Sequence, residues 1–122
     1  MNIQIMSKSG LPIYEQIERG IKDAIVNGEL NKGDLLPSIR SLAADLKISV
    51  ITTKRAYEDL EKEGMIYSVP GKGFFVDDPD LAYLLEKRNV SFEEDIKELV
   101  EKAKAANMSK ADILCMLDVF WD

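Results

Sequence analysis

The stretch that decides the fold is residues 36–76, which read LPSIRSLAADLKISVITTKRAYEDLEKEGMIYSVPGKGFFV. Ser38 and Ser49 each precede a run in which apolar residues recur three and four positions apart, the pattern of an amphipathic helix with a serine cap. Only Lys47 and Ile48 separate the first run from the second cap. We therefore expect a short helix behind Ser38 and a longer helix over residues 49–63, ended by Gly64.

Two β-prone runs follow the longer helix, Met65–Val69 and Phe74–Val76. The residues between them, Pro70-Gly71-Lys72-Gly73, are typical of a hairpin turn. Leu35-Leu36, just before the first helix of the pair, predicts a short strand beside this hairpin. We expect a small sheet over residues 65–76 with a basic, glycine-rich tip.

Helical segments flank this stretch. Pro12 suits a first helical turn, and a helical stripe follows it until Gly28 can stop the helix: Ile13, Tyr14, Ile17, Ile21, Ala24 and Ile25. Downstream, Asp77-Asp78-Pro79-Asp80 marks a boundary, so we expect one domain over 1–77 and a helical tail over 78–122. Within the tail, Ser91–Glu94 and Ser109–Asp112 fit capping boxes, which predicts a helix start at each.

Composition excludes several classes of protein. The chain is 46% apolar, has no run near the ~18 residues of a membrane span, and opens without a signal peptide's apolar run, so we expect a cytoplasmic protein. Cys115 is the single cysteine and histidine is absent, which removes an internal disulfide, the usual zinc sites and histidine-based catalysis. We also find no nucleophile–base pair or phosphate loop, and expect neither an enzyme nor a cofactor or metal.

The net charge of −6 is unevenly distributed. Residues 1–76 hold ten Lys/Arg and ten Asp/Glu, a balance of zero, whereas residues 77–122 hold six and twelve, a balance of −6. A nucleic-acid-binding face must then come from local clustering in the first part, with the acidic tail directed away from phosphates. The alternative is that the acidity only keeps the protein soluble.

The order short helix, turn, longer helix and basic hairpin predicts a winged helix-turn-helix, an α+β fold that is mainly α and reads DNA. Basic and hydroxyl side chains at the start of the longer helix can bind phosphates or guanine, and exposed apolar ones can pack on thymine methyl groups. The candidate DNA-binding residues are Arg40, Ser49, Val50, Ile51, Thr52, Lys54, Arg55, Gly71 and Lys72. Taken singly, the two cations of the helix could be ordinary surface, and its two apolar residues could be buried.

Residues 12–76 resemble the DNA-binding domain of the GntR family of bacterial transcription regulators. The resemblance lies in these segments: Pro12–Ile17, Gly28–Leu30, Gly33–Arg40, Leu42-Ala43, Ala56–Leu60, Glu63-Gly64 and Gly71–Val76. The short tail is similar to that of the YtrA subfamily, whose members lack a large effector domain. The resemblance implies a homodimeric regulator, usually a repressor, that binds a double-stranded DNA operator and often controls transporter genes. It carries the family's DNA contacts onto Arg40, Ser49, Thr52, Lys54, Gly71 and Lys72.

Two departures from the family pattern affect what the chain reads. Val50 stands where the family commonly has arginine, and Val69-Pro70 precedes the wing glycine where the family is often more basic. Fewer guanine contacts follow, so we expect weaker binding or a more A·T-rich half-site.

The tail carries more apolar surface than its length can bury. One winged helix makes few contacts for a specific site, whereas two copies about 34 Å apart would read a palindrome. We therefore expect the tail to dimerise through Phe92, Ile96, Leu99, Val100, Leu117, Phe120 and Trp121. The alternative is that these residues pack on the first helix of the DNA-binding domain.

A second function remains open from the sequence alone. The acidic composition and the apolar start of the longer helix would also suit a winged-helix protein-interaction module without DNA binding. A small-molecule effector is possible in a short regulator of this kind, but no motif marks its site.

Overall fold

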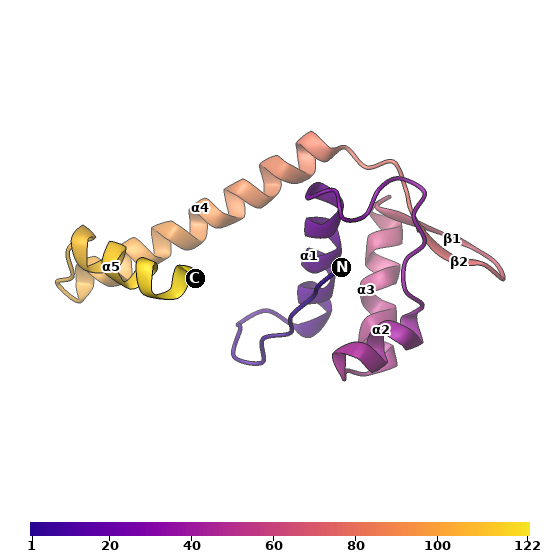
Figure 1. The fold of residues 1–122 in the computed structure, drawn as a ribbon, viewed down its shortest axis with the longest axis horizontal. Coiled ribbons are helices and arrows are strands. Elements are labelled where there is room, and N and C mark those ends of the chain that lie inside the picture. Colours follow the sequence, from indigo (N-terminus) through magenta and orange to yellow (C-terminus); the bar gives the residue numbers. More distant parts are fainter. The chain divides into compact units, whose positions relative to one another are not determined.

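The computed structural model describes residues 1–122 and divides into two compact units, Met1–Leu84 and Leu85–Asp122. Its elements in chain order are α1 (Ile13–Val26), α2 (Ile39–Leu46), α3 (Val50–Lys62), β1 (Ile66–Val69), β2 (Gly73–Val76), α4 (Leu81–Ala105) and α5 (Lys110–Trp121) (Figure 1). The structure is mainly helical with one two-stranded antiparallel sheet, so the predicted class is confirmed. None of its helices combines the length and the apolar character that a membrane crossing requires.

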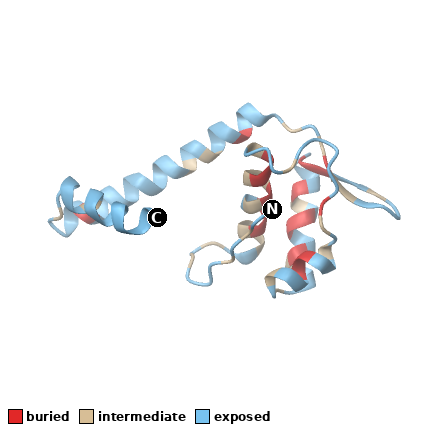
Figure 2. Ribbon diagram, viewed as in Figure 1, coloured by how far each residue is buried: buried red, intermediate tan, exposed pale blue.

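The core of the first unit lies where α1 and α3 face each other, and Figure 2 shows the buried stripes on both helices. Ile17 and Ile21 from α1 meet Tyr57 and Leu60 from α3, and all four are fully buried. Burial of one such apolar side chain is worth roughly 1.5–3 kcal/mol, so this contact fixes the position of α3. The Tyr57 ring also contacts the ring of Phe74 in β2, edge to face, with centroids 5.1 Å apart.

Serine caps begin both helices of the central pair, as predicted. The Ser38 hydroxyl accepts a hydrogen bond from the Ser41 amide at 3.0 Å, and Ser49 accepts one from the Thr52 amide at 3.0 Å. Each bond satisfies an amide that the helix itself leaves unpaired. Lys47 ends α2 in a left-handed conformation, with a φ of 57°, so α3 starts after a very short turn.

The hairpin also forms as predicted, with Val69 opposite Gly73 and Ile66 opposite Val76. The Lys72 amide donates to the Val69 carbonyl at 2.9 Å across Pro70 and Gly71, and Gly71 has a φ of 77°. Proline followed by a residue of positive φ is the pattern of a type II turn, which explains the glycine.

The strand expected at Leu35-Leu36 is reduced to a single bridge, between Leu35 and Phe75. The Leu36 amide donates to the Phe74 carbonyl at 2.9 Å, but the next residue is Pro37. Because proline has no amide hydrogen, it cannot extend the ladder. This segment therefore borders the sheet without adding a full strand.

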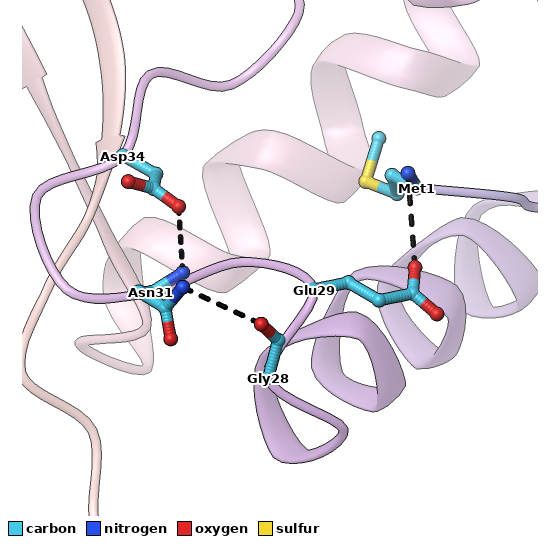
Figure 3. Close-up of polar contacts among 5 residues, drawn as sticks. All are labelled: Met1, Gly28, Glu29, Asn31 and Asp34. Carbon is cyan, nitrogen blue, oxygen red and sulfur yellow. Dashed lines mark hydrogen bonds and ion pairs between the residues drawn. The ribbon is translucent and has the colours of Figure 1, made fainter.

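Residues 1–11 form an N-terminal arm, which the side chain of Gln16 holds against α1. Its amide group accepts from the Met6 backbone at 2.8 Å and donates to the Met6 and Leu11 carbonyls at 3.0 Å each. The Met1 amine also lies 3.7 Å from the Glu29 carboxylate (Figure 3). These contacts give the arm a defined path along the first unit.

The turn after α1 is closed by Asn31, as Figure 3 shows. Its backbone amide donates to the Asp34 carboxylate at 2.8 Å, and its side chain donates to the Gly28 carbonyl at 3.4 Å. This turn delivers residues 33–36 to the open edge of β2.

Helix α4 continues from Leu81 to Ala105 without a break at Ser91, so the prediction of a new helix start there is wrong. No glycine or proline lies between residues 81 and 105 to stop the helix, and each added residue brings one more backbone hydrogen bond. The other capping box is confirmed: Ser109 and Asp112 exchange two hydrogen bonds, of 2.9 and 3.1 Å, at the start of α5. These bonds lower the pKa of the Asp112 carboxyl.

Candidate nucleic-acid interface

The first turns of α3 expose apolar side chains. Ile51 is 81% exposed and Val50 is 39% exposed, while Thr53 on the opposite side is fully buried and donates to the Ser49 carbonyl at 3.0 Å. The alternative in which Val50 and Ile51 are buried is therefore wrong. Contact of these apolar side chains with water is unfavourable, so covering them with a partner surface would contribute favourable free energy to binding.

A pair of hydroxyl groups lies at the same end of α3. The Ser49 hydroxyl accepts from the Thr52 amide and donates its own proton to the Thr52 hydroxyl at 2.7 Å. Because the Ser49 proton is used within the cap, Thr52 keeps its proton for an outside acceptor. Of the two predicted donors, Thr52 is thus the one ready to bind a phosphate oxygen.

Three predicted cations are exposed on this unit. Lys54 pairs with Glu58 one helical turn on, at 3.7 Å, a contact that is typically worth only about 0.3–0.5 kcal/mol. Arg40 on α2 and Lys72 at the hairpin tip form no ion pair within the chain. All three can therefore neutralise an external anion at little cost.

Arg55, the fourth predicted cation, is also exposed, but it contacts two residues of its own unit. Its guanidinium lies 3.8 Å from the centre of the Tyr14 ring, and its Nε is 3.9 Å from an Asp59 oxygen. Tyr14 belongs to α1, so this cation–π contact joins α1 to α3. The sequence placed Tyr14 in the apolar stripe of α1 and gave no sign of its contact with Arg55.

The hairpin is fastened to α3 by Glu61, a residue that sequence reasoning missed. The Glu61 carboxylate accepts from the Ser68 amide at 3.1 Å and from the Ser68 hydroxyl at 2.7 Å. Tyr67 and Phe75 stack on the hairpin with ring centroids 5.7 Å apart. This hairpin, the wing, extends from the C-terminal end of α3 (Figure 1). The contacts fix its strands, and Lys72 lies at its tip.

A polar recess of about 360 Å³ opens between α1 and α3. Glu18 lies in it with 8% of its surface exposed, and Lys22 pairs with Glu63 at 2.7 Å. Burial first, then the neighbouring Asp59 and Glu63 carboxylates, raise the pKa of Glu18 to about 7. The residues that line the recess are Tyr14, Glu15, Glu18, Arg19, Lys22, Arg55, Asp59 and Glu63.

The seven residues predicted to dimerise the chain are all exposed, between 41% and 82%. The chain has no group of three or more His, Cys, Asp or Glu side chains placed to hold a metal ion.

Comparisons with known proteins agree on one family. The model of the family described as bacterial regulatory proteins, gntR family, matches residues 13–76. The HTH-type transcriptional repressor YtrA of Bacillus subtilis is 35% identical over 106 residues, which cover 87% of this chain and 82% of the relative. The chain spans 39% of the length of another relative, the repressor NagR of the same organism.

Solved structures give the same result. YtrA from Sulfolobus acidocaldarius, a GntR-family transcription factor, superposes with a TM-score of 0.59 and 35% identity, over 95% of this chain and 93% of that one. The DNA-binding domain of AraR in complex with operator ORR3 superposes with a TM-score of 0.54 and 30% identity, over 62% of this chain and 92% of that one.

Proposed function

Because the chain belongs to the gntR family of bacterial regulatory proteins, we propose that this DNA-binding transcription regulator acts as a homodimeric repressor on a palindromic operator. Its relatives are named as transcription regulators and not as enzymes. In this proposal residues 1–77 form the DNA-binding domain and residues 78–122 the dimerisation tail. The site of action is the bacterial chromosome, and hence the cytoplasm.

The exposed start of α3 is the observation that carries the proposal. Helix-turn-helix proteins read the major groove with the N-terminal turns of their second helix, and here those turns leave Ile51 81% exposed. Val50 and Ile51 pack on thymine methyl groups, while Thr52 and Lys54 bind the backbone or a base edge. An A·T-rich half-site follows from the two apolar side chains.

Two further cations extend the contact beyond α3. Arg40 on α2 reaches the phosphate backbone or a base edge beside the major groove. Lys72, next to Gly71 at the wing tip, enters the adjacent minor groove. Both are free of intramolecular ion pairs, so each is ready to replace a counterion on the DNA. Arg55 serves the helix pair rather than the DNA, because its guanidinium already lies over Tyr14.

The proposed dimer is supported by the spacing along α4. Leu85, Phe92 and Leu99 recur every seven residues, with Ile96 and Ala103 four positions after the last two. This is the a/d spacing of helices that pack along one another. Leu85, Phe92, Ile96 and Leu99 are exposed within the chain, so a second copy is the surface that would cover them.

The experiment is a salt titration of DNA binding. Duplexes selected from a random pool serve as the operator, and affinity is measured by fluorescence anisotropy at several salt concentrations. We expect affinity to fall steeply as salt rises. Arg40→Ala and Lys72→Ala should each reduce the slope of log affinity against log salt concentration by about two in the dimer, because each protomer loses one phosphate contact. Lys62→Ala, at the opposite end of α3, is the matched control and should keep the wild-type slope. A slope near zero, or equal slopes for all three variants, would contradict this reading surface.

A further inference from the structure

A series of contacts links α1 to α3, the helix that carries the proposed reading surface. The Tyr14 ring lies under the Arg55 guanidinium at 3.8 Å, and Arg55 lies 3.9 Å from Asp59. Asp59 lines the same recess as Glu18 of α1, whose side chain is buried there. These contacts lead from Tyr14 on α1 through two residues of α3 to the recess that Glu18 lines.

We propose that Glu18 is a positioning residue for the DNA-reading helix: its neutral carboxyl donates a hydrogen bond to Asp59, and Asp59 then holds Arg55 against Tyr14. The proposal deepens the proposed function and rests on it, because α3 is the helix assigned to the major groove. Glu18 touches no DNA itself. It acts by fixing how α3 lies on α1.

The surroundings of Glu18 favour the neutral form. Burial withdraws water from the carboxyl group, and the carboxylates of Asp59 and Glu63 add negative charge next to it, so the pKa of Glu18 rises to about 7. Lys22 acts in the opposite direction, but its ammonium is already 2.7 Å from Glu63. The other charged groups that line the recess are Glu15, Arg19 and Arg55.

Loss of the proton would break the proposed hydrogen bond between Glu18 and Asp59. Two ionised carboxylates repel each other, so Glu18 and Asp59 would separate towards solvent in the recess, and Arg55 would lose its partner. The α1–α3 junction would loosen, and binding of α3 in the groove would then have to pay for ordering it again. Operator affinity should therefore fall as pH rises through about 7. The chain has no histidine, so no imidazole titration overlaps this change.

The test compares operator affinity near pH 6 and near pH 8, either side of the raised pKa, for the full-length protein and three variants. The wild type should lose affinity by about fivefold or more, the lower end of common coupling between sites. Glu18→Gln keeps a permanent donor to Asp59, so at both pH values it should bind the operator with the affinity that the wild type has at the lower pH. Glu18→Ala removes the donor and should bind weakly at both. Glu15→Gln removes a carboxylate from the same recess and should keep the wild-type pH response.

A second measurement separates this inference from the proposed function. Carbon-13 NMR of the carboxyl groups reports the Glu18 titration directly, and the Arg55 Nε–H resonance reports its contact. If the protein bound no DNA at either pH, the reading surface would be refuted, yet a Glu18 titration near 7 that moves the Arg55 signal would support the positioning contact. A Glu18 titration near 4.5, the ordinary value for glutamate, would overturn the inference. So would identical pH responses of the wild type and Glu18→Gln.

Discussion

The two units of this chain treat their apolar side chains in opposite ways. The first unit closes a core around α1 and α3, in which Ile17, Ile21, Tyr57 and Leu60 have no exposed surface. The second unit buries Ala103 alone and leaves most of its large apolar residues exposed. One unit therefore carries its own folding energy, whereas the other needs a surface from outside itself.

The contrast is greatest in α5. Its apolar side chains do not lie on one stripe, and the exposed ones are Leu114, Met116, Leu117, Val119, Phe120 and Trp121. A helix that is apolar on most sides is normally buried on most sides. A dimer in which α5 contacts more than one helix would meet that requirement, and a single shallow contact would not.

The largest expected difference is between matched leucine truncations in the two units. Leu60→Ala empties a fully buried site and should cost about 2–5 kcal/mol of unfolding free energy. Leu99→Ala, at a site that is 42% exposed, should leave the stability of the first unit unchanged and weaken only association. Urea denaturation at several protein concentrations measures both. Equal losses at all concentrations would show that the second unit has a core of its own.

Next in size is the effect of a charge in the proposed dimer surface. Ile96→Asp would bury an unpaired carboxylate between copies, so the dissociation constant should rise by about 100-fold, which corresponds to about 3 kcal/mol. Sedimentation velocity over a dilution series measures the shift from dimer to monomer. Lys97→Asp introduces the same side chain at the next position, off the apolar stripe, and should remain a dimer. A dimeric Ile96→Asp protein would place the interface elsewhere.

A smaller effect should appear in the pH dependence of stability. Because folding raises the pKa of Glu18, the folded state binds this proton more tightly than the unfolded chain, and the stabilisation is greatest at low pH. It should be lost as pH rises from about 4.5 to about 7, so unfolding free energy falls over that interval. Glu18→Gln should remove this part of the slope in urea denaturation series. An unchanged slope would mean that Glu18 does not titrate in this way.

The smallest predicted effects come from the helix caps. Ser49→Ala removes the acceptor for the Thr52 amide and should cost the first unit about 0.5–2 kcal/mol. Ser109→Ala removes the matching bond at the start of α5, so it should reduce association by a few-fold and leave the first unit's melting temperature unchanged. Calorimetry and sedimentation separate the two. Equal changes in melting temperature would remove the distinction between the units.

The sequence predicted the elements that local chemistry decides. The serine caps at Ser38, Ser49 and Ser109 were all correct, because the acceptor and its amide lie within three residues of each other. The hairpin was correct for a similar reason, since proline and glycine fix its turn. At Ser91 the same local pattern failed, because a capping sequence inside a run of good helix formers does not interrupt the helix.

Contacts between distant segments were beyond the sequence. Glu61 reads as an ordinary exposed helix residue, and only the folded chain brings it to Ser68. Glu18 is similar, because its burial depends on how α1 packs on α3. Val50 and Ile51 on α3 are exposed, but the contact between Arg55 and Tyr14 had no signal in residue type or spacing.

The most direct measurement compares binding of the full-length protein to a selected palindrome and to one isolated half-site, with stoichiometry from sedimentation. If the first unit reads DNA and the second joins two copies, the dimer should bind the palindrome about 100-fold or more tighter than the half-site, because only the palindrome engages both of its DNA-binding units. Equal affinity for both duplexes, with one chain on each, would contradict the division of roles between the two units.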